Sequence, residues 1–566
     1  MGEFNLPKEE KDNVTNENNE KFNLLDKGWI NVVTDYKGTT KLVGMKEFFE
    51  NAHNYIALAG DTPTQDFAVM RFLLAVLHTV FSKYDADGNV YDGIKLDDRG
   101  KQINEISGRA AKNYPKALMK TWKDLWNKGK FPDIVNDYLE KWRDRFYLFD
   151  DKYPFYQVTR ELIRQIDPKY DNVESDTTCI WPSLLNRRVS ESGNKIAIFS
   201  SKDESNKNHL SNSELVRWLI TFQGVSNASD KKSINKIPNK SIGWIYNLGG
   251  VYLNSENLFK TTMLNFVIKH NESQFNTAQK PYWELEIEEL YKKYLENLPT
   301  DNLAELYTDW SRIMYYFIKK PENIGIFRIL KTNEINREDN FLEPMTTWKI
   351  YNGITTPKKH NPNEYAWRSF GLIINNENRL PGVVDNLTSI KEYISDVKDI
   401  HIKCVSAVYD DNSMSRAMID EVYDSIDLNL EVATDLQEDG WVERINTVVE
   451  DTKYVLDIIY KDFLKDIKSL TNVESKKFID NLMEKVYFEL NMPFKNWLSE
   501  ITYNDNKEKK IYEWLKTLKQ IVFRRAENLV KNSGNKEYIG KTNNGSVKNI
   551  ASSFNIFAAR LNEKIN

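Results

Sequence analysis

Four amphipathic stretches near the carboxyl-terminal end constrain the fold of this chain most strongly. Their apolar side chains recur every three or four residues, the spacing that places them on one face of an α-helix. The stretches begin near Ile445, Phe478, Ile511 and Val547. Helices with one apolar face each can bury those faces around a shared core. We therefore expect residues 431–566 to form a four-helix bundle, with Pro493 interrupting the continuation of its second helix.

The start of the chain predicts a hairpin followed by a buried helix. Residues 22–43 alternate apolar and polar side chains, which is typical of a short β-hairpin. Further on, Thr62 can cap a helix, Pro63 suits its first position, and Gln65 completes a capping box. The apolar run Phe67–Phe81 follows directly, so we expect this helix to lie in the core.

The pattern in the middle of the chain predicts helices separated by loops rich in Asn, Ser and Lys. We expect helices at Glu214–Phe222 and Leu303–Ile318. The segment Ile400–Tyr409 predicts a strand, and the polar residues 410–413 after it predict a turn. Helices outnumber strands in this reading.

The predicted fold class is mainly α with minor β, an α+β arrangement. With 566 residues, 40% of them hydrophobic, the chain can fill more than one core. We expect a disordered tail at residues 1–21, a large irregular N-terminal domain at 22–430, and the bundle at 431–566.

Cysteine usage and hydropathy favour a cytoplasmic protein. The two cysteines, Cys179 and Cys404, are too few for a disulfide framework or for zinc sites built from cysteine pairs. No apolar run approaches the roughly 18 residues that a membrane span needs. The polar start of the chain also differs from a signal peptide.

The patterns that mark catalytic and metal centres are missing or incomplete. Gly534 and Gly540–Thr542 resemble a phosphate-binding loop, but five residues separate the glycines where four are needed, so we expect a surface loop. Asp85, Asp87 and Asn89 resemble a calcium loop that lacks its glycine and its final glutamate, so we expect a polar turn. The six histidines never pair at helical spacing. We therefore assign no catalytic residue, metal ligand or cofactor.

Basic residues concentrate in two segments of a chain whose net charge is −5. Residues 186–240 contain ten basic and five acidic side chains, and residues 507–531 contain eight and three. Each segment could contact the phosphates of a nucleic acid. Each could equally be a solvated surface whose charges are balanced by neighbouring acids.

Three segments near the start of the chain carry a family resemblance. They are FNLLDKGWI at 22–30, LAGDTPTQ at 58–65 and FDDKYPFYQ at 149–157. Together they resemble the opening of the CasA-type large subunits of the type I-E CRISPR Cascade complex. LSNSE at 210–214 and LITFQ at 219–223 are similar to the helix that precedes a DNA-contacting loop in that family.

This resemblance implies a binding protein and not an enzyme. Such a subunit recognises the protospacer-adjacent motif of double-stranded target DNA, helps to open the duplex for R-loop formation, and recruits a helicase-nuclease. Its other partners would be the crRNA-containing Cascade subunits: the backbone, the small subunit and the subunit that binds the 5′ handle. The resemblance implies no membrane partner.

The resemblance also assigns candidate DNA contacts. The loop after Gln223 corresponds to a glycine-rich motif-reading loop, but most of its glycines are replaced here, so side chains would make the contacts. The loop candidates are Asn227, Lys231, Lys232, Lys236 and Lys240. The turn after Tyr409 resembles a wedge that enters the duplex, and its candidates are Asn412, Ser413 and Met414.

Two further groups of candidates are basic. Lys292 and Lys293 follow Pro281-Tyr282-Trp283, where the family carries a lysine finger for the minor groove. Lys516, Arg524 and Arg525 lie on the basic face expected in the bundle. Two alternatives stay open: a metal- or nucleotide-dependent nucleic-acid enzyme, and a helical scaffold that contacts only protein.

Overall fold

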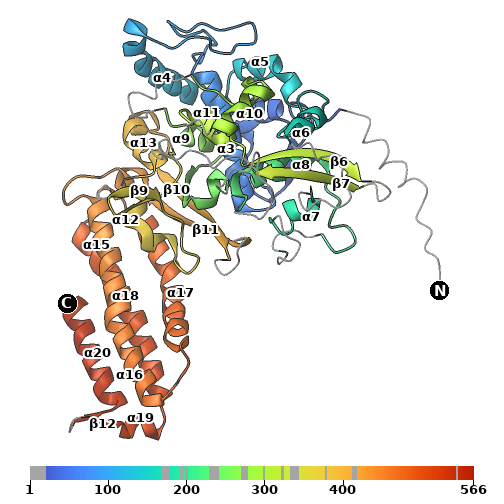
Figure 1. Cartoon of the computed structure of the whole chain (residues 1–566). Helices are drawn as coiled ribbons and strands as arrows, with labels where there is room; N and C mark the ends of the chain where they lie inside the picture. The colour runs from blue at the N-terminus through green and yellow to red at the C-terminus, as the bar shows by residue number, and fades with distance from the viewer. Residues whose placement is uncertain are drawn as a thin grey trace, which may run out of the picture. The chain divides into compact units, whose positions relative to one another are not determined.

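The chain forms two compact units in a computed structural model (Figure 1). The structure describes residues 21–166, 179–190, 197, 202–227, 241–268, 278–296, 300–319, 324–331, 343–375, 379–410, 417–543 and 546–565. Unit 1 comprises residues up to Thr346 together with Thr355–Lys359 and Val405–Tyr423, and unit 2 comprises the rest. Residues 360–404 thus group with the bundle, so this division differs from the expected boundary after residue 430. The expected tail at 1–21 lies outside the described residues except for Lys21.

Unit 1 opens with the predicted hairpin. Strands β1 (Ile30–Val33) and β2 (Thr40–Val43) pair antiparallel, and β3 (Ala57–Leu58) adds to the other edge of β1. Gly38 has a φ of +85° in the turn, a conformation that glycine adopts without strain. The short helix α2 (Met45–Asn51) follows the hairpin.

Helix α3 (Pro63–Phe81) is the core helix that the sequence predicts. The Thr62 side chain accepts a hydrogen bond of 3.1 Å from the amide of Gln65, and Pro63 occupies the first turn. The Gln65 side chain accepts from the amide of Asp61 at 2.9 Å instead of closing the box on Thr62. Among the described residues, α3 alone is long and apolar enough to cross a membrane, contrary to the sequence expectation, but 94% of that stretch is buried within the fold.

The other elements of the two units are mostly short. The helices are α4 (Gly108–Lys128), α5 (Ile134–Lys141), α6 (Arg160–Ile166), α7 (Pro182–Leu185), α8 (Asn212–Val225), α9 (Leu258–Asn265), α10 (Ile287–Glu296), α12 (Phe370–Ile373), α13 (Gly382–Ile390) and α14 (Leu430–Ala433). The strands β5 (Gly250–Asn254), β10 (Asp399–Tyr409) and β11 (Met418–Asn429) form a sheet in the order β11-β10-β5, and β8 (Trp348–Tyr351) pairs with β9 (Ile354–Pro357). The strand expected at Ile400–Tyr409 is therefore confirmed as β10.

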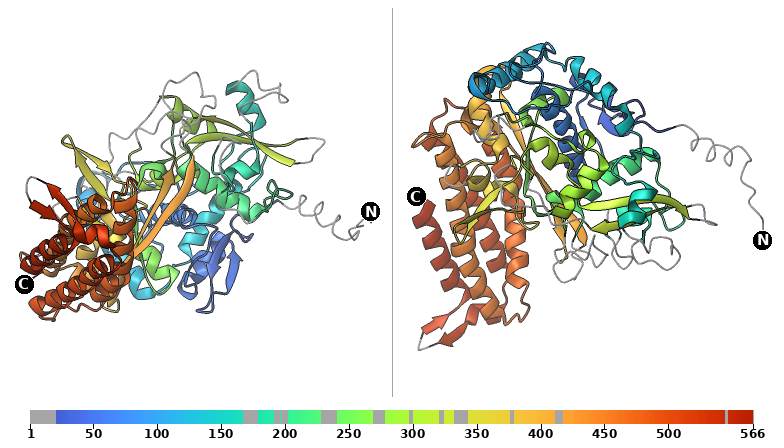
Figure 2. Two further views of the ribbon diagram at one scale, coloured as in Figure 1. Left: turned by 90° about the horizontal axis from the view of Figure 1, so that it is seen from below. Right: turned by 45° about the horizontal axis from the view of Figure 1, so that its top comes forward.

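The single helix expected at Leu303–Ile318 is wrong in its second half. Helix α11 (Leu303–Thr308) ends at Thr308, and β6 (Arg312–Lys319) begins four residues later. Strand β6 pairs antiparallel with β7 (Ile324–Lys331) along its whole length, and β7 also pairs with β4 (Cys179–Ile180). Aromatic and β-branched side chains favour a strand here, and the cross-strand partner outweighs the helical spacing. The two strands form the long hairpin in Figure 2.

Unit 2 contains the predicted four-helix bundle. Its first helix runs through α15 (Trp441–Tyr454), a π-helical segment (Val455–Tyr460) and α16 (Lys461–Thr471). The other three are α17 (Phe478–Ser499), α18 (Lys507–Lys531) and α20 (Ile550–Ile565). Apolar faces meet in the centre, where the rings of Phe463 and Phe557 stack at 5.0 Å.

The expectation that Pro493 interrupts the second bundle helix is wrong. Helix α17 continues through Pro493 for another six residues. Proline removes one helical hydrogen bond at a cost of about 3 kcal/mol. The turn after it buries Phe494, whose ring stacks on Trp367 at 4.3 Å and meets Trp514 edge-on at 4.8 Å. These aromatic contacts explain why the helix persists.

The segment that resembled a phosphate-binding loop is a small α/β turn structure. Gly534 precedes the short helix α19 (Asn535–Ile539), and Gly540 leads into a hairpin of β12 (Lys541–Asn543) and β13 (Ser546–Lys548). The ammonium of Lys541 donates to the carbonyl of Ser469 and to Asn472. The segment is therefore more regular than the expected surface loop.

The segments at 22–30 and 58–65, which carry the family resemblance, bind helix α8 through hydrogen bonds and an ion pair. The guanidinium of Arg217, on α8, is buried and donates to the Trp29 carbonyl at 3.0 Å and to the Gln65 side chain at 3.1 Å. It also pairs with Asp61 at 3.2 Å, while the indole of Trp218 donates to the same carboxylate at 2.6 Å. The segments at 22–30 and 58–65 thus meet on one arginine, which fixes the orientation of α8.

We predict that Arg217→Met destabilises unit 1. The substitution leaves the buried Trp29 carbonyl without its donor, and each such buried group costs about 1–3 kcal/mol. Thermal unfolding should begin several degrees lower than in the unmodified protein. The matched control is Arg524→Met, because the Arg524 side chain is 60% exposed and its surface ion pair contributes little. Equal shifts for both variants would contradict the anchoring role.

Candidate nucleic-acid interface

A buried arginine closes the base of the candidate motif-reading loop. Arg312 is fully buried, and its guanidinium donates to the carbonyl of Asn227 at 2.5 Å and to that of Ser241 at 3.0 Å. These two residues are the last described before the loop and the first described after it. One side chain therefore holds both ends of the loop together.

The neighbours of Arg312 complete a buried polar network. The Gln223 side chain accepts from the amides of Ser311 and Arg312, each at 2.9 Å, and donates to the Arg312 carbonyl at 2.8 Å. The Ser226 and Ser311 hydroxyls lie 2.5 Å apart. Gly243 lies against the end of α8, where a Cβ atom would stand 2.1 Å from the Gly224 carbonyl oxygen. Only glycine allows this approach, so the ends of the loop have a defined spacing.

The loop candidates themselves are only partly described. Asn227 is 2% exposed, and its carbonyl is the group that Arg312 holds. Its side chain therefore faces the interior instead of a ligand. Lys231, Lys232, Lys236 and Lys240 lie outside the described residues.

The candidate wedge follows directly from the end of β10. The amide of Asp410 donates to the Ala417 carbonyl at 3.0 Å, which closes the base of the turn between β10 and β11. Asn412, Ser413 and Met414 lie between these two residues and outside the described part of the chain. The structure thus describes the stem of the candidate wedge.

An aromatic contact brings the stem of the candidate wedge beside the end of α8, the helix that precedes the candidate motif-reading loop. The ring of Tyr409 packs on Tyr246 with centroids 3.8 Å apart, and its hydroxyl donates to the Val225 carbonyl at 3.3 Å. Val225 is the last residue of α8, two residues before Asn227. The ammonium of Lys359 lies over both rings, 4.3 Å from the centre of Tyr246 and 4.2 Å from that of Tyr409. Burial raises the pKa of Tyr409 well above its usual value, so its hydroxyl keeps its proton and remains a donor.

The two candidates for a lysine finger differ in exposure. Lys293 is buried, and its ammonium lies 2.8 Å from Asp309 and 2.5 Å from Glu305. Burial alone would lower the pKa of Lys293, but the two carboxylates outweigh it and raise the pKa above its usual value. Lys292 is 69% exposed at its side chain and lies 3.8 Å from Glu296 on the same helix. Only Lys292 is therefore placed to reach a ligand.

Two of the three bundle candidates have an acidic partner on the next helix. Arg524 and Arg525 both donate to the carboxylate of Glu489 on α17. Lys516 is exposed on α18. The shared ion pair with Glu489 favours a structural role for Arg524 and Arg525.

No group of three or more metal-binding side chains gathers among the residues that the structure describes. The segment Asp85–Asn89 forms the expected polar turn, in which the Asp85 carboxylate accepts from the amides of Asp87 and Asn89 at 2.9 Å. His78 is buried, with its ring 4.7 Å from that of Phe266.

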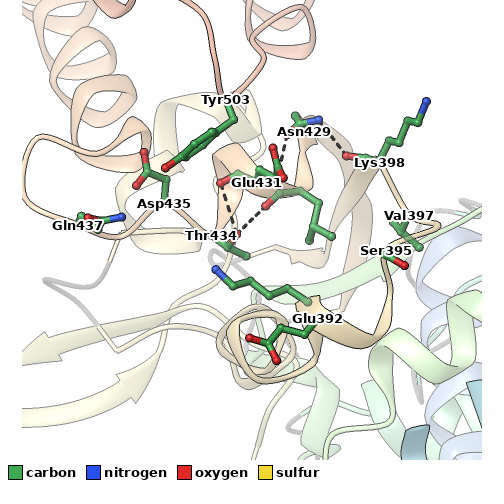
Figure 3. A pocket seen from close by; sticks show the side chains of 12 residues that line it. Glu392, Ser395, Val397, Lys398, Asn429, Glu431, Thr434, Asp435, Gln437 and Tyr503 are labelled. Atoms are coloured by element: carbon green, nitrogen blue, oxygen red, sulfur yellow. Dashed lines mark hydrogen bonds between the residues drawn. The ribbon is translucent and has the colours of Figure 1, made fainter. Parts of the chain in front are cut away.

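Unit 2 contains an open cavity of about 630 Å³ (Figure 3). Its polar walls are bonded within the fold: the Asn429 amide donates to the Lys398 carbonyl at 3.1 Å, and the Thr434 hydroxyl donates to the Leu430 carbonyl at 2.9 Å. The carboxylate of Asp435 accepts from the amide of Trp441 at 2.8 Å. These groups support the turn that leads into α15.

The family model for CRISPR-associated protein Cse1 matches residues 23–525. The chain belongs to the Cse1 family. The resemblance to CasA-type large subunits is therefore confirmed. The CasA/Cse1 protein of Thermus thermophilus is 28% identical over 205 residues, which are 36% of this chain and 31% of that protein. The matched stretch thus spans about a third of the length of this relative.

Solved Cse1 structures have the same fold. The Cse1 structure from Thermobifida fusca is 19% identical, with 96% of this chain and 98% of that chain covered and a TM-score of 0.73. Cse1 from Acidimicrobium ferrooxidans is 18% identical, with 96% and 99% covered and a TM-score of 0.69. A chain of a CRISPR RNA-guided surveillance complex is 12% identical, with 96% and 99% covered and a TM-score of 0.66. The α+β fold class expected from the sequence is confirmed.

In this Cse1 chain, we predict that Arg312→Met loosens the base of the candidate motif-reading loop. Two buried carbonyls lose their donor, so the segments on either side of the loop should open more often. Hydrogen exchange measured by mass spectrometry should be faster at residues 223–227 and 241–246. Arg524→Met is the control, because it removes an arginine that lies far from the loop in the sequence. Unchanged exchange in both segments would show that Arg312 does not hold the loop.

Proposed function

We propose that this chain is the DNA-recognition subunit of a type I-E Cascade complex. It would bind target duplex DNA, recognise the protospacer-adjacent motif, and help to open the duplex for R-loop formation. The observation that carries the proposal is the hydrogen bond from Tyr409 to the Val225 carbonyl. Through it, the stems of two loops far apart in the sequence lie side by side. A motif reader and a wedge need this arrangement, because opening must begin next to the motif.

The motif-reading loop would act through its lysines. Family membership supports the loop assignment, and the buried side chain of Asn227 argues for removing that residue from the contacts. Lys231, Lys232, Lys236 and Lys240 would neutralise phosphates beside the motif. Lys292 would add a cation from α10, whereas the ion pairs of Lys293 support a structural role for it.

The wedge would act by separating stacked base pairs. Met414 can insert between base steps, which costs a few kcal/mol per step, while Asn412 and Ser413 can bond to base edges. Strands β10 and β11 flank the candidate wedge in the sequence and would support it, and the amide of Asp410 donates to the Ala417 carbonyl at the base of the turn. A rigid stem favours insertion because little conformational freedom of the backbone is lost on binding.

The remaining partners and location follow from the same proposal. The chain would assemble in the cytoplasm with the crRNA-containing subunits, namely the backbone, the small subunit and the 5′-handle-binding subunit. The assembled complex would recruit a helicase-nuclease that cuts the DNA. In this proposal the chain itself has no catalytic role and no cofactor. Lys516 is exposed on α18, so its side chain would be free to add a peripheral phosphate contact.

We predict that combined substitution of Asn412, Ser413 and Met414 by alanine impairs duplex opening. R-loop formation by the assembled complex should fall strongly on duplex targets, because the wedge then no longer offsets the cost of unstacking. Binding to a single-stranded target should change little, since no duplex has to open. A gel-shift assay with both substrates measures this difference. Equal loss on the two substrates would remove the wedge assignment.

We predict that Lys231→Glu with Lys232→Glu weakens binding to duplex DNA of any sequence. Each phosphate-binding cation that is removed should reduce the slope of log K against log salt by about 0.9, so this double variant should reduce it by about 1.8. Titrations of the assembled complex between low and moderate salt measure the slope. Lys476→Glu with Lys477→Glu, on an exposed loop of the bundle, changes the net charge equally and serves as the control. An unchanged slope in the loop variant would exclude these two lysines as DNA-binding groups.

A further inference from the structure

Helix α4 carries a row of cations on one face. Its 21 residues include six basic side chains and one acid, Asp124. Five of the cations recur at intervals of three or four residues, which places them side by side along the helix. These five, the α4 row, are Arg109, Lys112, Lys116, Lys120 and Lys123. All five are exposed. The sequence expectations, which identified basic segments at 186–240 and 507–531, missed this row.

The opposite face of α4 packs into unit 1. Tyr114, Leu118, Trp122 and Leu125 are buried, and the rings of Trp122 and Trp126 stack at 5.4 Å. The indole of Trp122 donates to the Met263 carbonyl at 3.3 Å on α9. The helix therefore has a fixed rotation about its axis, and the α4 row faces solvent.

The charges of the α4 row disfavour the helix that carries them. Neighbours such as Lys112 and Lys116 are like charges one turn apart, which destabilises a helix. The first turn contains no acid, so Arg109 and Lys112 lie unbalanced at the positive end of the helix dipole. Lys120 pairs with Asp124 at 2.5 Å. Arg109, Lys112 and Lys116 have no ion pair within the described residues.

The bundle shows how this chain balances cations elsewhere. On α18, Arg524 and Arg525 share Glu489, and Lys531 lies 3.7 Å from Glu527. At the far end of α4, Asp87 likewise pairs with Lys128 at 2.7 Å. The first three cations of the α4 row, in contrast, present positive charge that no described acid neutralises by an ion pair. Such a surface fits an external polyanion.

The length of the α4 row and the absence of exposed aromatic rings on α4 favour duplex DNA over other polyanions. From Arg109 to Lys123 the row is about 21 Å long, at 1.5 Å per residue, which matches about six base pairs. Surfaces for single strands combine cations with exposed aromatic rings on which bases stack. All three aromatic side chains of α4, Tyr114, Trp122 and Trp126, are buried. We infer that the α4 row binds the phosphate backbone of double-stranded DNA. The inference rests on the proposed function for its context and adds a sequence-independent surface to it.

The test compares two triple variants of the full-length chain. Lys112→Gln, Lys116→Gln and Lys120→Gln remove three charges from the α4 row. Lys37→Gln, Lys476→Gln and Lys477→Gln remove three exposed charges from other loops and are the control. Fluorescence anisotropy with a motif-free 30-base-pair duplex, over a range of salt, should show at least about tenfold weaker binding for the first variant only. Its salt slope should fall by about 2.7, which is three phosphates at 0.9 each.

Two further measurements keep the result interpretable. Circular dichroism and thermal unfolding should show that the α4 variant is at least as stable as the unmodified protein, because glutamine removes like-charge repulsion. The charge-preserving variant Lys112→Arg, Lys116→Arg, Lys120→Arg should keep duplex affinity. Equal loss of affinity in the α4 and control variants would contradict the inference. A larger loss on RNA or single-stranded DNA than on the duplex would also contradict it.

The outcome is separable from that of the proposed function. Binding to the DNA backbone carries no sequence information, so the assembled complex with the α4 variant should keep the affinity ratio between targets with and without the motif. If the unmodified complex showed no preference for any motif, the proposed function would fail. The duplex affinity of the isolated chain would still decide whether the α4 row binds DNA.

Discussion

The burial of two guanidinium groups, one beside each end of α8, determines how this chain presents its loops. Arg217 fixes the first half of α8 to the Trp29 carbonyl and to Asp61, and Arg312 ties the far end to the start of β6. A buried guanidinium is unfavourable unless its donors are bonded. The surrounding carbonyls must therefore keep their positions, and the helix between them acts as a rigid support. The candidate loop follows the end of this helix in the sequence, and Tyr409 in the stem of the candidate wedge donates to the Val225 carbonyl at that end.

Charge in this protein has two different roles that composition alone does not separate. The chain is acidic overall, yet it contains a buried pair between Lys83 and Glu284, shared surface pairs on α18, and the unbalanced row on α4. Buried and shared charges fix the fold. Like charges along one helix destabilise it. They contribute favourable free energy only when a bound partner of opposite charge neutralises them. The local balance of ion pairs is thus a better guide to a binding surface than a count of lysines.

Much of the fold could be predicted from the sequence, because local signals agreed with the tertiary structure. Thr62 and Pro63 start α3 where capping rules place it, and the amphipathic stretches after Ile445 form the bundle. The predictions were wrong where contacts with residues distant in the sequence determine which secondary structure forms. Strand β6 exists because β7 pairs with it, and α17 continues past Pro493 because Trp367 and Trp514 pack on the following turn.

The candidate site was harder to predict for the same reason. The burial of Lys293 depends on Glu305 and Asp309, and nothing local distinguishes it from Lys292. Arg312 and Gln223 lie far apart in the sequence and form no motif, so their role in closing the loop has no sequence signal. The α4 row did have a sequence signal, the helical spacing of its cations. Acidic residues in the flanking loops obscured that signal.

The proposed function requires this chain to read the protospacer-adjacent motif for the Cascade complex. Its most direct test is the selection of bound targets from a library with a randomised motif, by Cascade reconstituted with and without this chain. We expect a short sequence beside the target to be enriched only when the chain is present. Enrichment of the same sequence without the chain, or of no sequence with it, would contradict the proposed function.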